Sequence, residues 1–511
     1  MELQFPLIFT FLLLCLPLMI IVMRKGKRAR FPPGPTKLPI IGNLHNLMMG
    51  GLPHHSLRRL AKEYGPLMHL KLGEVSTVII SSPEMAKEIM KTHDLKFVGR
   101  PELLAVTIML YNSTSVVSSP YGPYWRQLRK ICTLELLTAK RVQSFRSQRE
   151  EEMSNLIGSI TESLTSPATV GEMVVNFSEK VNSLSNDMIA RAAFGKKCKD
   201  KHVFLSSMEE VLKFISGFDV VELFPSQRYL QVISGTKAKL MKFHENVDKI
   251  LNDIIEDHKV KKTSDSDNGD SEEDLVDVLL RLKESGDLEV PFTNDNMKAI
   301  ILDIFTAGSE TIAIALEWAM AELIKCPSAM EKVQTEVREV IKGKTHVDES
   351  EIHKLSYLKL VIKETLRMHP PAPLLAPRVC VEDCEINGYE IPKSTRVIVN
   401  AWALGRDPQY WENAECFQPE RFDGNDIDYK GDKFEYIPFG GGRRICPGIL
   451  FGIANIELPL AQLLYHFDWK LPNCAKPEEL DMTEAFGGMS KPKNHLKLVP
   501  TLYPHMPVRK D

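Results

Sequence analysis

The chain is poor in two features that would narrow its function at once, paired cysteines and net charge. Its nine cysteines are scattered over 511 residues without a Cys-x-x-Cys pair. This scatter argues against both a zinc site and a secreted disulfide framework, and it fits a reducing compartment. The formal net charge of −3 gives no sign of nucleic-acid binding. There is no internal repeat, and length alone would suggest about three domains of ~150 residues.

Charge is also missing from one stretch near the N-terminus. Phe5 to Met23 contains 19 residues without a charged side chain, which is just long enough to cross a bilayer core as a helix. A basic cluster follows this run, whereas a cleaved signal peptide, the competing interpretation, would place its charges before the run. By the positive-inside rule, everything after the cluster stays in the cytosol. The cluster consists of Arg24, Lys25, Lys27, Arg28 and Arg30.

The N-terminal pattern predicts three parts. Residues 1–23 form a transmembrane anchor, residues 24–36 a basic and proline-rich hinge, and residues 37–511 the globular body. The hinge contains Pro32-Pro33-Gly34-Pro35, which breaks any helical continuation and stiffens the connection.

The start of the body predicts β structure. Residues 67–72 and 77–81 alternate well enough for two strands joined by Gly73-Glu74. Ser82-Pro83 then has the residue order that is preferred at a helix start.

The second half of the chain adds further β signals. Asn387-Gly388 lies between two short β-type runs and predicts a hairpin with a type I′ turn. Residues 395–401 predict another strand. Apolar residues at helical spacing fill most of the region from 122 to 369. We therefore expect a mainly α fold with a small β-rich lobe near its N-terminal side.

One polar segment interrupts the helical middle. Residues 262–274 are polar and acidic and have no apolar anchor. This composition predicts a mobile surface loop. Docking of a partner protein is the alternative interpretation.

The most informative stretch runs from Phe439 to Gly448. It holds a single cysteine, Cys446, where a glycine-rich loop meets an amphipathic run at residues 449–467. Pro447 suits a first helical position. Backbone N–H groups and the positive end of a helix dipole favour thiolate over thiol, and a thiolate with one open face can serve as the fifth ligand of a haem iron. The alternative is a buried cysteine beside a turn.

The spacing Phe-x-x-Gly-x-Arg-x-Cys-x-Gly is satisfied at all five fixed positions. On this motif the chain resembles the cytochrome P450 family, and the resemblance extends from Pro32 to about Pro500. It implies one haem-centred domain with the P450 fold. It also implies haem b bound through the thiolate of Cys446, with Phe439 and Gly448 in the cofactor-binding loop.

The most periodic helix is predicted at residues 293–326. Within it, residues 307–311 read Ala-Gly-Ser-Glu-Thr, and the glycine, which costs ~1 kcal/mol relative to alanine, suggests a groove widened for dioxygen. The resemblance implies that Thr311 hydrogen-bonds bound oxygen and that Glu310 helps to relay protons. The alternative is a threonine that bonds its own preceding carbonyl. Ile312 stands where the family usually has Thr or Ser, so a relay through a second hydroxyl is in doubt.

Two further motifs supply charged pairs. Glu364 and Arg367 lie three residues apart on a predicted helix, close enough to pair. Pro419-Glu420-Arg421-Phe422 supplies the second pair. By resemblance, Arg421 joins Glu364 and Arg367 in a buried network that braces the haem-ligand loop. Their role is therefore structural.

Donors for the haem propionates are also implied by the resemblance. Trp125 and Arg129 lie at i,i+4 spacing, which places an indole N–H and a guanidinium side by side. With Arg378 and Arg444 they are the implied propionate partners. Without the family, a solvated helix face would explain Arg129 equally well. Arg443 is the less suitable of the two adjacent arginines.

The family resemblance implies a monooxygenase. One oxygen atom of dioxygen enters the substrate and the other leaves as water. The chain has no flavin or nicotinamide fingerprint, so a membrane-bound NADPH-dependent flavoprotein reductase is the implied electron donor. A haem-thiolate isomerase or dehydratase, which would need neither Thr311 nor Glu310, is the alternative from another class, and a non-catalytic haem carrier is a further one. The N-terminal motifs resemble plant microsomal members, which implies a single-pass protein of the endoplasmic reticulum membrane.

The expected substrate pocket is apolar. By resemblance it is lined by residues of a loop, a helix face and two turns. Such a lining orients a skeleton by shape and predicts hydroxylation of a sesqui- or diterpenoid, with an alkaloid or flavonoid as the alternative. The pocket residues are Val106, Ile301, Phe305, Leu374, Leu375 and Phe486.

Overall fold

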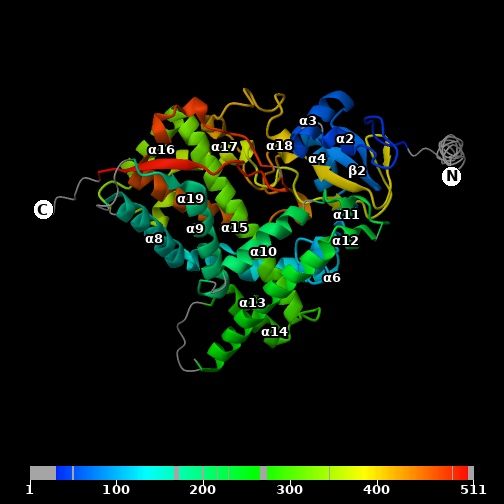
Figure 1. Cartoon of the computed structure of the whole chain (residues 1–511), viewed down its shortest axis with the longest axis horizontal. Coiled ribbons are helices and arrows are strands. Elements are labelled where there is room, and N and C mark those ends of the chain that lie inside the picture. The colour runs from blue at the N-terminus through cyan, green and yellow to red at the C-terminus, as the bar shows by residue number, and fades with distance from the viewer. Residues whose placement is uncertain are drawn as a thin grey trace, which may run out of the picture.

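The structure is a computed structural model of the chain (Figure 1). The predicted anchor, residues 1–23, and residues 24–29 of the hinge lie outside the described residues, as does Phe486. The described residues are 30–48, 51–165, 172–197, 201–215, 217–227, 229–264, 273–344, 346–485 and 487–504.

Helices make up most of the described chain, as the sequence predicts. The predicted helical middle, residues 122–369, corresponds closely to the stretch from α6 to α17. The helices are α2 (Leu44–Met48), α3 (Pro53–Tyr64), α4 (Pro83–Lys87), α5 (Leu104–Met109), α6 (Pro123–Ile131), α7 (Ala139–Ser144), α8 (Arg146–Thr165), α9 (Phe177–Phe194), α10 (Lys201–Ile215), α11 (Val220–Leu223), α12 (Tyr229–Ile233), α13 (Thr236–Ser264), α14 (Leu275–Ser285), α15 (Asn294–Lys325), α16 (Pro327–Val340), α17 (Ser356–Met368), α18 (Ala401–Leu404) and α19 (Ile449–His466).

The β-rich lobe is built on a four-stranded sheet of order β1-β2-β7-β4. The β1–β2 and β7–β4 pairs are antiparallel, whereas β2 and β7 run parallel. The hairpin β5–β6 and the sheet β3-β9-β8 are separate from it. The strands are β1 (Leu67–Leu72), β2 (Val75–Ile80), β3 (Val175–Asn176), β4 (Arg378–Val379), β5 (Cys384–Ile386), β6 (Tyr389–Ile391), β7 (Arg396–Val399), β8 (Phe467–Lys470) and β9 (Lys497–Leu502).

Local sequence signals explain these β elements. The predicted turn between β1 and β2 is present, with Gly73 in the left-handed region at φ 59°. The hairpin turn has Asn387 at φ 50° and Gly388 at φ 77°, as a type I′ turn requires. Ser82 caps α4 by accepting a hydrogen bond from the Met85 N–H. All three predictions are confirmed.

Both faces of the four-stranded sheet are buried. Alternate residues of a strand point to opposite faces, and in β7 Val397 and Val399 join one hydrophobic cluster while Ile398 joins another. In Figure 1 this lobe lies at the right, around the labels β2, α2, α3 and α4, and the longer helices fill the rest of the molecule.

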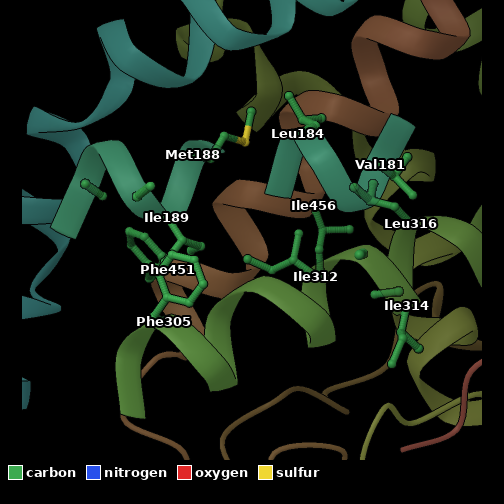
Figure 2. Packing of buried hydrophobic residues seen from close by; sticks show 14 of the residues in the cluster. Val181, Leu184, Met188, Ile189, Phe305, Ile312, Ile314, Leu316, Phe451 and Ile456 are labelled. Carbon is green, nitrogen blue, oxygen red and sulfur yellow. The ribbon is translucent and has the colours of Figure 1, made fainter. Parts of the chain in front are cut away.

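The central helix α15 organises the larger hydrophobic core. Its N-terminus is capped by a reciprocal pair, Thr293 and Asn296, in which each side chain accepts a hydrogen bond from the backbone N–H of the other residue. Its apolar side packs against α9 and α19, as Figure 2 shows for the buried side chains of these three helices. The predicted range 293–326 differs from the observed one only by the two capping residues.

Two helices among the described residues are apolar and long enough to cross a membrane, α15 and α19. Both are mostly buried. They are therefore core helices of the folded body.

Two predicted boundaries are wrong. The acidic segment, residues 262–274, was expected to be a loop throughout, but α13 continues to Ser264 and Asp274 caps α14; residues 265–272 lie outside the described residues. Pro447 is not the first residue of a helix, because α19 begins at Ile449.

Candidate functional site

The loop before α19 places the sulfur of Cys446 in a fixed position. The Cys446 N–H donates to the Phe439 carbonyl oxygen (3.0 Å), and the Gly448 N–H donates to Sγ of Cys446 (3.3 Å). Gly442 has φ 67°, and a Cβ there would overlap the Met90 carbonyl oxygen. This glycine therefore permits both the turn and the close approach of the loop to the backbone at Met90.

Burial dominates the acidity of this thiol. It raises the pKa of Cys446, while the Gly448 N–H and the guanidinium of Arg129 lower it less. We expected backbone N–H groups and the positive end of a helix dipole to favour thiolate. The Gly448 N–H acts in this direction, but burial has the larger effect, and the helix starts three residues after the cysteine. A coordinated metal ion removes a thiol proton outright, so the thiolate form depends on the iron.

Arg444 and Trp125 lie together beside this loop. The Arg444 guanidinium is 4.5 Å from the ring centroid of Trp125, and it donates to the carbonyl oxygens of Val98 (3.1 Å), Val116 (3.3 Å) and Ser119 (2.7 Å). The Trp125 indole N–H donates to the Val116 carbonyl oxygen as well (2.9 Å).

Arg129 and Arg378 complete the set of predicted cations. Arg129 donates to the Ile445 carbonyl oxygen, next to the sulfur. Arg378 donates to Asp94 Oδ1 (2.6 Å) and to the Gly441 carbonyl oxygen (2.7 Å). Both arginines thus contact the loop that holds the cysteine.

A fifth member of this group was missed in the sequence. Arg100 donates to the carbonyl oxygens of Ala376 (2.7 Å) and Pro377 (2.8 Å). Burial lowers its pKa, and the neighbouring guanidinium groups of Arg444 and Arg378 lower it further. Only the tertiary fold brings these arginines together, so no local spacing reveals Arg100.

This group carries more positive than negative charge. Among the described residues, Asp94 is the carboxylate that pairs with it, while Arg100, Arg129 and Arg444 donate to backbone carbonyls. Buried charges are normally paired. The two propionates of a haem would supply the missing negative charge, and the cysteine sulfur would supply the axial ligand. The residues present therefore fit a haem.

One face of α15 is accessible near the middle of the helix, and we call it the open face. Ala307 is exposed and Thr311 half-buried, although Ile312 and the residues after it are buried. The Thr311 hydroxyl donates to the Ala307 carbonyl oxygen, the local hydrogen bond that a helical threonine commonly makes. Its oxygen can still accept a hydrogen bond.

The other residues of the motif point elsewhere. A Cβ on Gly308 would lie 2.9 Å from Cδ1 of Ile189 on α9, so this glycine permits close packing of two helices rather than a wider groove for dioxygen. Glu310 lies 3.8 Å from the ammonium group of Lys491. Ile312 is in the core against α9 and α19 (Figure 2), so a hydroxyl at this position would not share the face of Thr311.

Two predicted pocket residues on α15 are in the core instead. Phe305 is 2% exposed, and its ring contacts those of Phe194 (6.0 Å between centroids) and Phe204 (4.7 Å); Figure 2 shows it beside Ile189. Ile301 is likewise buried. The expectation that both line the substrate cavity is corrected. Counting three and four residues back from Ala307 gives Ile304 and Asp303, and this 3.6-residue period could have identified the correct face.

Three of the remaining predicted pocket residues, Val106, Leu374 and Leu375, lie on other elements. Val106 is on α5 and is 7% exposed. Leu374 and Leu375 are half-buried, and a Cβ on Gly440 would lie 3.9 Å from Cδ1 of Leu375, which places this leucine next to the cysteine loop.

Asp303 is a buried carboxyl group on the open face of α15. Its Oδ2 accepts a hydrogen bond from the Val117 N–H (3.2 Å). Burial raises its pKa to about 7, while hydrogen bonds from Val117 and Ser115 act in the opposite direction. Asp303 also raises the pKa of the buried Cys132 thiol, as Cys446 does. The helix face and the cysteine loop are therefore close to each other.

The predicted structural network is formed. Arg367 donates from Nε to Glu364 Oε2 (2.7 Å) and from Nη2 to Oε1 (2.8 Å), and Arg421 donates to the same carboxylate (2.9 Å). The side chains of Glu364 and Arg367 are fully buried. Nη1 of Arg367 donates to the carbonyl oxygens of Gly405 and Ala414. The network therefore connects α17 to the loops that precede the cysteine loop.

The chain is similar to known proteins over most of its length. The sequence model of the family described as "Cytochrome P450" matches residues 32–498. Desmethyl-deoxy-podophyllotoxin synthase of Sinopodophyllum hexandrum is 58% identical over 98% of this chain and 97% of its own. Premnaspirodiene oxygenase of Hyoscyamus muticus is 52% identical over 95% and 96%, and salviol synthase of Salvia pomifera 51% identical over 94% and 94%.

The fold is shared with solved structures. A zebrafish cytochrome P450 with abiraterone superimposes with a TM-score of 0.73 at 24% sequence identity, and the match covers 89% of this chain and 99% of the other. The predicted mainly α fold with a small β-rich lobe is therefore confirmed. On the family match, the relatives and the shared fold, this chain belongs to the cytochrome P450 family of haem-thiolate monooxygenases.

Proposed function

We propose that the protein hydroxylates an apolar plant specialised metabolite, a sesqui- or diterpenoid, with electrons that reach it from NADPH through a membrane-bound flavoprotein reductase. The observation that carries the oxygenase part is the position of Cys446, which accepts a hydrogen bond from Gly448 within a cationic group. When bound there, a thiolate-ligated haem supplies dioxygen activation and O–O cleavage.

The chain's own residues have separate tasks in this proposal. Cys446 would ligate the haem iron, and the Gly448 N–H, which donates to its sulfur, holds the sulfur in position and partly neutralises its negative charge. Trp125, Arg129, Arg378 and Arg444, together with Arg100, would hold the propionates. Their backbone hydrogen bonds keep the guanidinium planes in place before the cofactor binds, so little ordering is needed on binding.

Proton delivery is assigned to α15. The Thr311 hydroxyl donates to the Ala307 carbonyl oxygen one turn earlier, and its oxygen is able to accept a further hydrogen bond. Glu310 is half-buried near Lys491 and serves as the acid that resupplies protons. The buried apolar residues that follow Thr311 exclude bulk water from the helix.

An apolar substrate is supported by the lining of the open face. Ile304, Ala307, Leu374 and Leu375 offer hydrophobic area, and the carboxyl of Asp303 is already bonded to a backbone N–H. A glycoside or a charged substrate would leave polar groups unpaired there, at ~1–3 kcal/mol each.

The names of relatives lend partial support. Premnaspirodiene oxygenase and 5-epiaristolochene 1,3-dihydroxylase of Nicotiana tabacum, which is 51% identical, are named for unsaturated hydrocarbons that they oxygenate. Desmethyl-deoxy-podophyllotoxin synthase is named for a different compound. The substrate test must therefore include both types, as well as alkaloids and flavonoids.

Membrane attachment at the endoplasmic reticulum is supported by the charge-free run at residues 5–23 and by exposed hydrophobic side chains in the described part of the chain. Ile40 is 82% exposed, and Val232 and Ile233 on α12 are each 77% exposed. Backbone hydrogen bonds link their neighbourhoods: the Gly73 N–H donates to Ile41 (3.3 Å) and the Glu74 N–H to Leu223 (2.8 Å). In Figure 1, α12 lies on the same side of the molecule as α2 and β2.

The substrate proposal is tested by adding library compounds to the purified haem protein and recording shifts of the haem spectrum. Terpene hydrocarbons should produce a shift and, with the reductase, NADPH and dioxygen, a hydroxylated product. Leu375→Ala should change the oxidised position, whereas Phe305→Leu, in the core, should leave it unchanged. Tight binding and turnover of podophyllotoxin-type compounds or other aromatics, with no response to any terpene, would refute the substrate class only.

Membrane attachment is tested by deletion of residues 1–23. The truncated protein should leave the membrane fraction in part, because the exposed side chains around α12 still bind. Adding Ile233→Asp should release the remainder. Complete release by the deletion alone would show that this surface does not contact lipid.

A further inference from the structure

A cluster of histidine and acidic side chains lies outside the haem site, where α3 meets the C-terminal segment. Nε2 of His54 is 2.7 Å from Oε2 of Glu484, and their side chains are 4% and 6% exposed. The adjacent His55 is exposed, and its ring lies against Trp402 with 4.2 Å between centroids. One ligand atom from each of His54, His55 and Glu484 can be chosen so that all lie within 4.8 Å of one another.

A third histidine faces the same carboxylate from inside the protein. His369 Nε2 is hydrogen-bonded to Oε1 of Glu322 (2.7 Å), and the ring stacks on Trp318 with 3.9 Å between centroids and 6° between planes. Its Nδ1 is buried without a hydrogen-bond partner and lies 4.0 Å from Oε1 of Glu484.

The carboxylate of Glu322 fixes the orientation of the His369 ring, because a carboxylate oxygen only accepts and Nε2 therefore carries a proton. The carboxylate of Glu484 has a histidine nitrogen next to each of its oxygens. These nitrogens are Nε2 of His54 at Oε2 and Nδ1 of His369 at Oε1.

We propose that His54, His55 and Glu484 bind a divalent transition-metal ion of the zinc class. Two imidazole nitrogens and one carboxylate are the donors of many zinc sites that keep a fourth position open. Calcium and magnesium prefer oxygen ligands alone, so nitrogen donors select against them. Metal ligands bind in their deprotonated form, so a proton held by these groups goes to solvent when the metal ion binds.

The site is accessible and its charge is suitable. A cavity of about 740 Å³ is lined by His55, His369 and Glu484, among others. Two cations are nearby, but both pair with another acid: Arg58 (2.6 Å) and Arg406 (3.2 Å) each contact Glu415. These two arginines therefore do not compete with the histidines for the carboxylate of Glu484.

Metal binding would connect two parts of the fold. His54 and His55 belong to α3, beside the four-stranded sheet. Glu484 forms a β-bridge with Pro492, and the Ala485 N–H donates to the Lys491 carbonyl oxygen (2.8 Å). The metal ion would thus attach α3 to the bridge between Glu484 and Pro492 and should raise the free energy of unfolding.

The test uses the full chain, loaded with haem and carrying no histidine tag. Zinc chloride is titrated by calorimetry, and bound zinc is counted per haem after dialysis. We expect one zinc ion per haem, an unchanged haem spectrum and a higher unfolding midpoint with zinc. His55→Ala should weaken zinc binding about tenfold or more. Because His55 is exposed, this variant should fold normally.

Two further variants complete the test. Glu484→Gln keeps the shape of the side chain and should abolish binding. His353→Ala is the matched control, because His353 is also exposed but lies on a remote turn, and it should bind zinc like the parent. Absence of stoichiometric zinc in the parent, or a zinc ion that His55→Ala retains with full affinity, would overturn the proposal. The second outcome would move the metal to another group, such as His258 with Asp274 and Asp277.

Discussion

Asp303 provides a quantitative test of the open face of α15. Its carboxyl group is 8% exposed, and burial raises its pKa to about 7 from an ordinary value of 3.8. Asp303→Asn removes the ionisation but keeps an oxygen that can accept from the Val117 N–H. The substitution therefore isolates the cost of the buried charge.

The sign of the effect follows from proton binding. Between about pH 4 and pH 7 the folded state binds more protons at Asp303 than the unfolded state does, so the stability of the parent falls as pH rises through this window. The pKa difference corresponds to roughly 4 kcal/mol at pH 8, at about 1.4 kcal/mol per pH unit. Part of this cost is already present at pH 5. The free energy of unfolding of Asp303→Asn minus that of the parent should therefore increase by about 2–3 kcal/mol from pH 5 to pH 8.

The measurement is urea unfolding of the detergent-solubilised holoprotein at pH 5, 6, 7 and 8. Asp295→Asn is the matched control, because Asp295 lies in the first turn of the same helix with a side chain that is 63% exposed. Its difference from the parent should change little with pH. A difference for Asp303→Asn that is equally flat would refute the reasoning and would mean that a cation or water compensates the carboxylate.

Three further substitutions test other parts of the structure. Thr311→Ala should keep the haem content but consume more NADPH per product, with the excess appearing as peroxide; full coupling would show that another residue or a water chain delivers the protons. Gly308→Ala should lower the free energy of unfolding by about 1–3 kcal/mol, because the new methyl group meets Ile189 on α9; an increase, as helix propensity alone predicts, would contradict this packing. Glu364→Ala should lower the free energy of unfolding by about 3–5 kcal/mol, because it leaves buried guanidinium groups unpaired. Lys332→Ala, which breaks an exposed ion pair, should lower it by less than about 1 kcal/mol. Equal effects of the two substitutions would contradict the role of burial.

Much of the fold was predictable because its signals are local. The cap at Thr293 and the helical period fix α15 within one residue at each end, and Asn387-Gly388 fixes the hairpin turn. The boundary errors at residues 262–264 and at Pro447 both concern the exact end of a helix. Polar residues continue an exposed helix when its first turns are anchored, and a proline can lie in the turn before a helix.

Only those parts of the candidate site that lie within one short segment of the sequence could be predicted. The cysteine loop and residues 307–311 are read directly from the sequence. Arg100 was missed because its partners come from distant segments. Phe305 was misplaced because an apolar residue on a central helix suits both a cavity and a core, and only the packing against α9 and α10 distinguishes them.

The acidity of Cys446 shows a different limit. Its neighbours along the chain favour thiolate, but burial has the larger effect and raises its pKa. Burial depends on every element that surrounds the loop, so it cannot be obtained from the local motif.

The most direct test of the account is the absorption spectrum of the reduced protein with carbon monoxide. The parent should show the red-shifted Soret band of a haem-thiolate, and Cys446→Ala should lose both this band and monooxygenase activity. Cys132→Ala, which removes another buried thiol close to the site, should retain both. A Cys446→Ala protein that kept the band and the activity would contradict the central claim that this sulfur binds the haem iron.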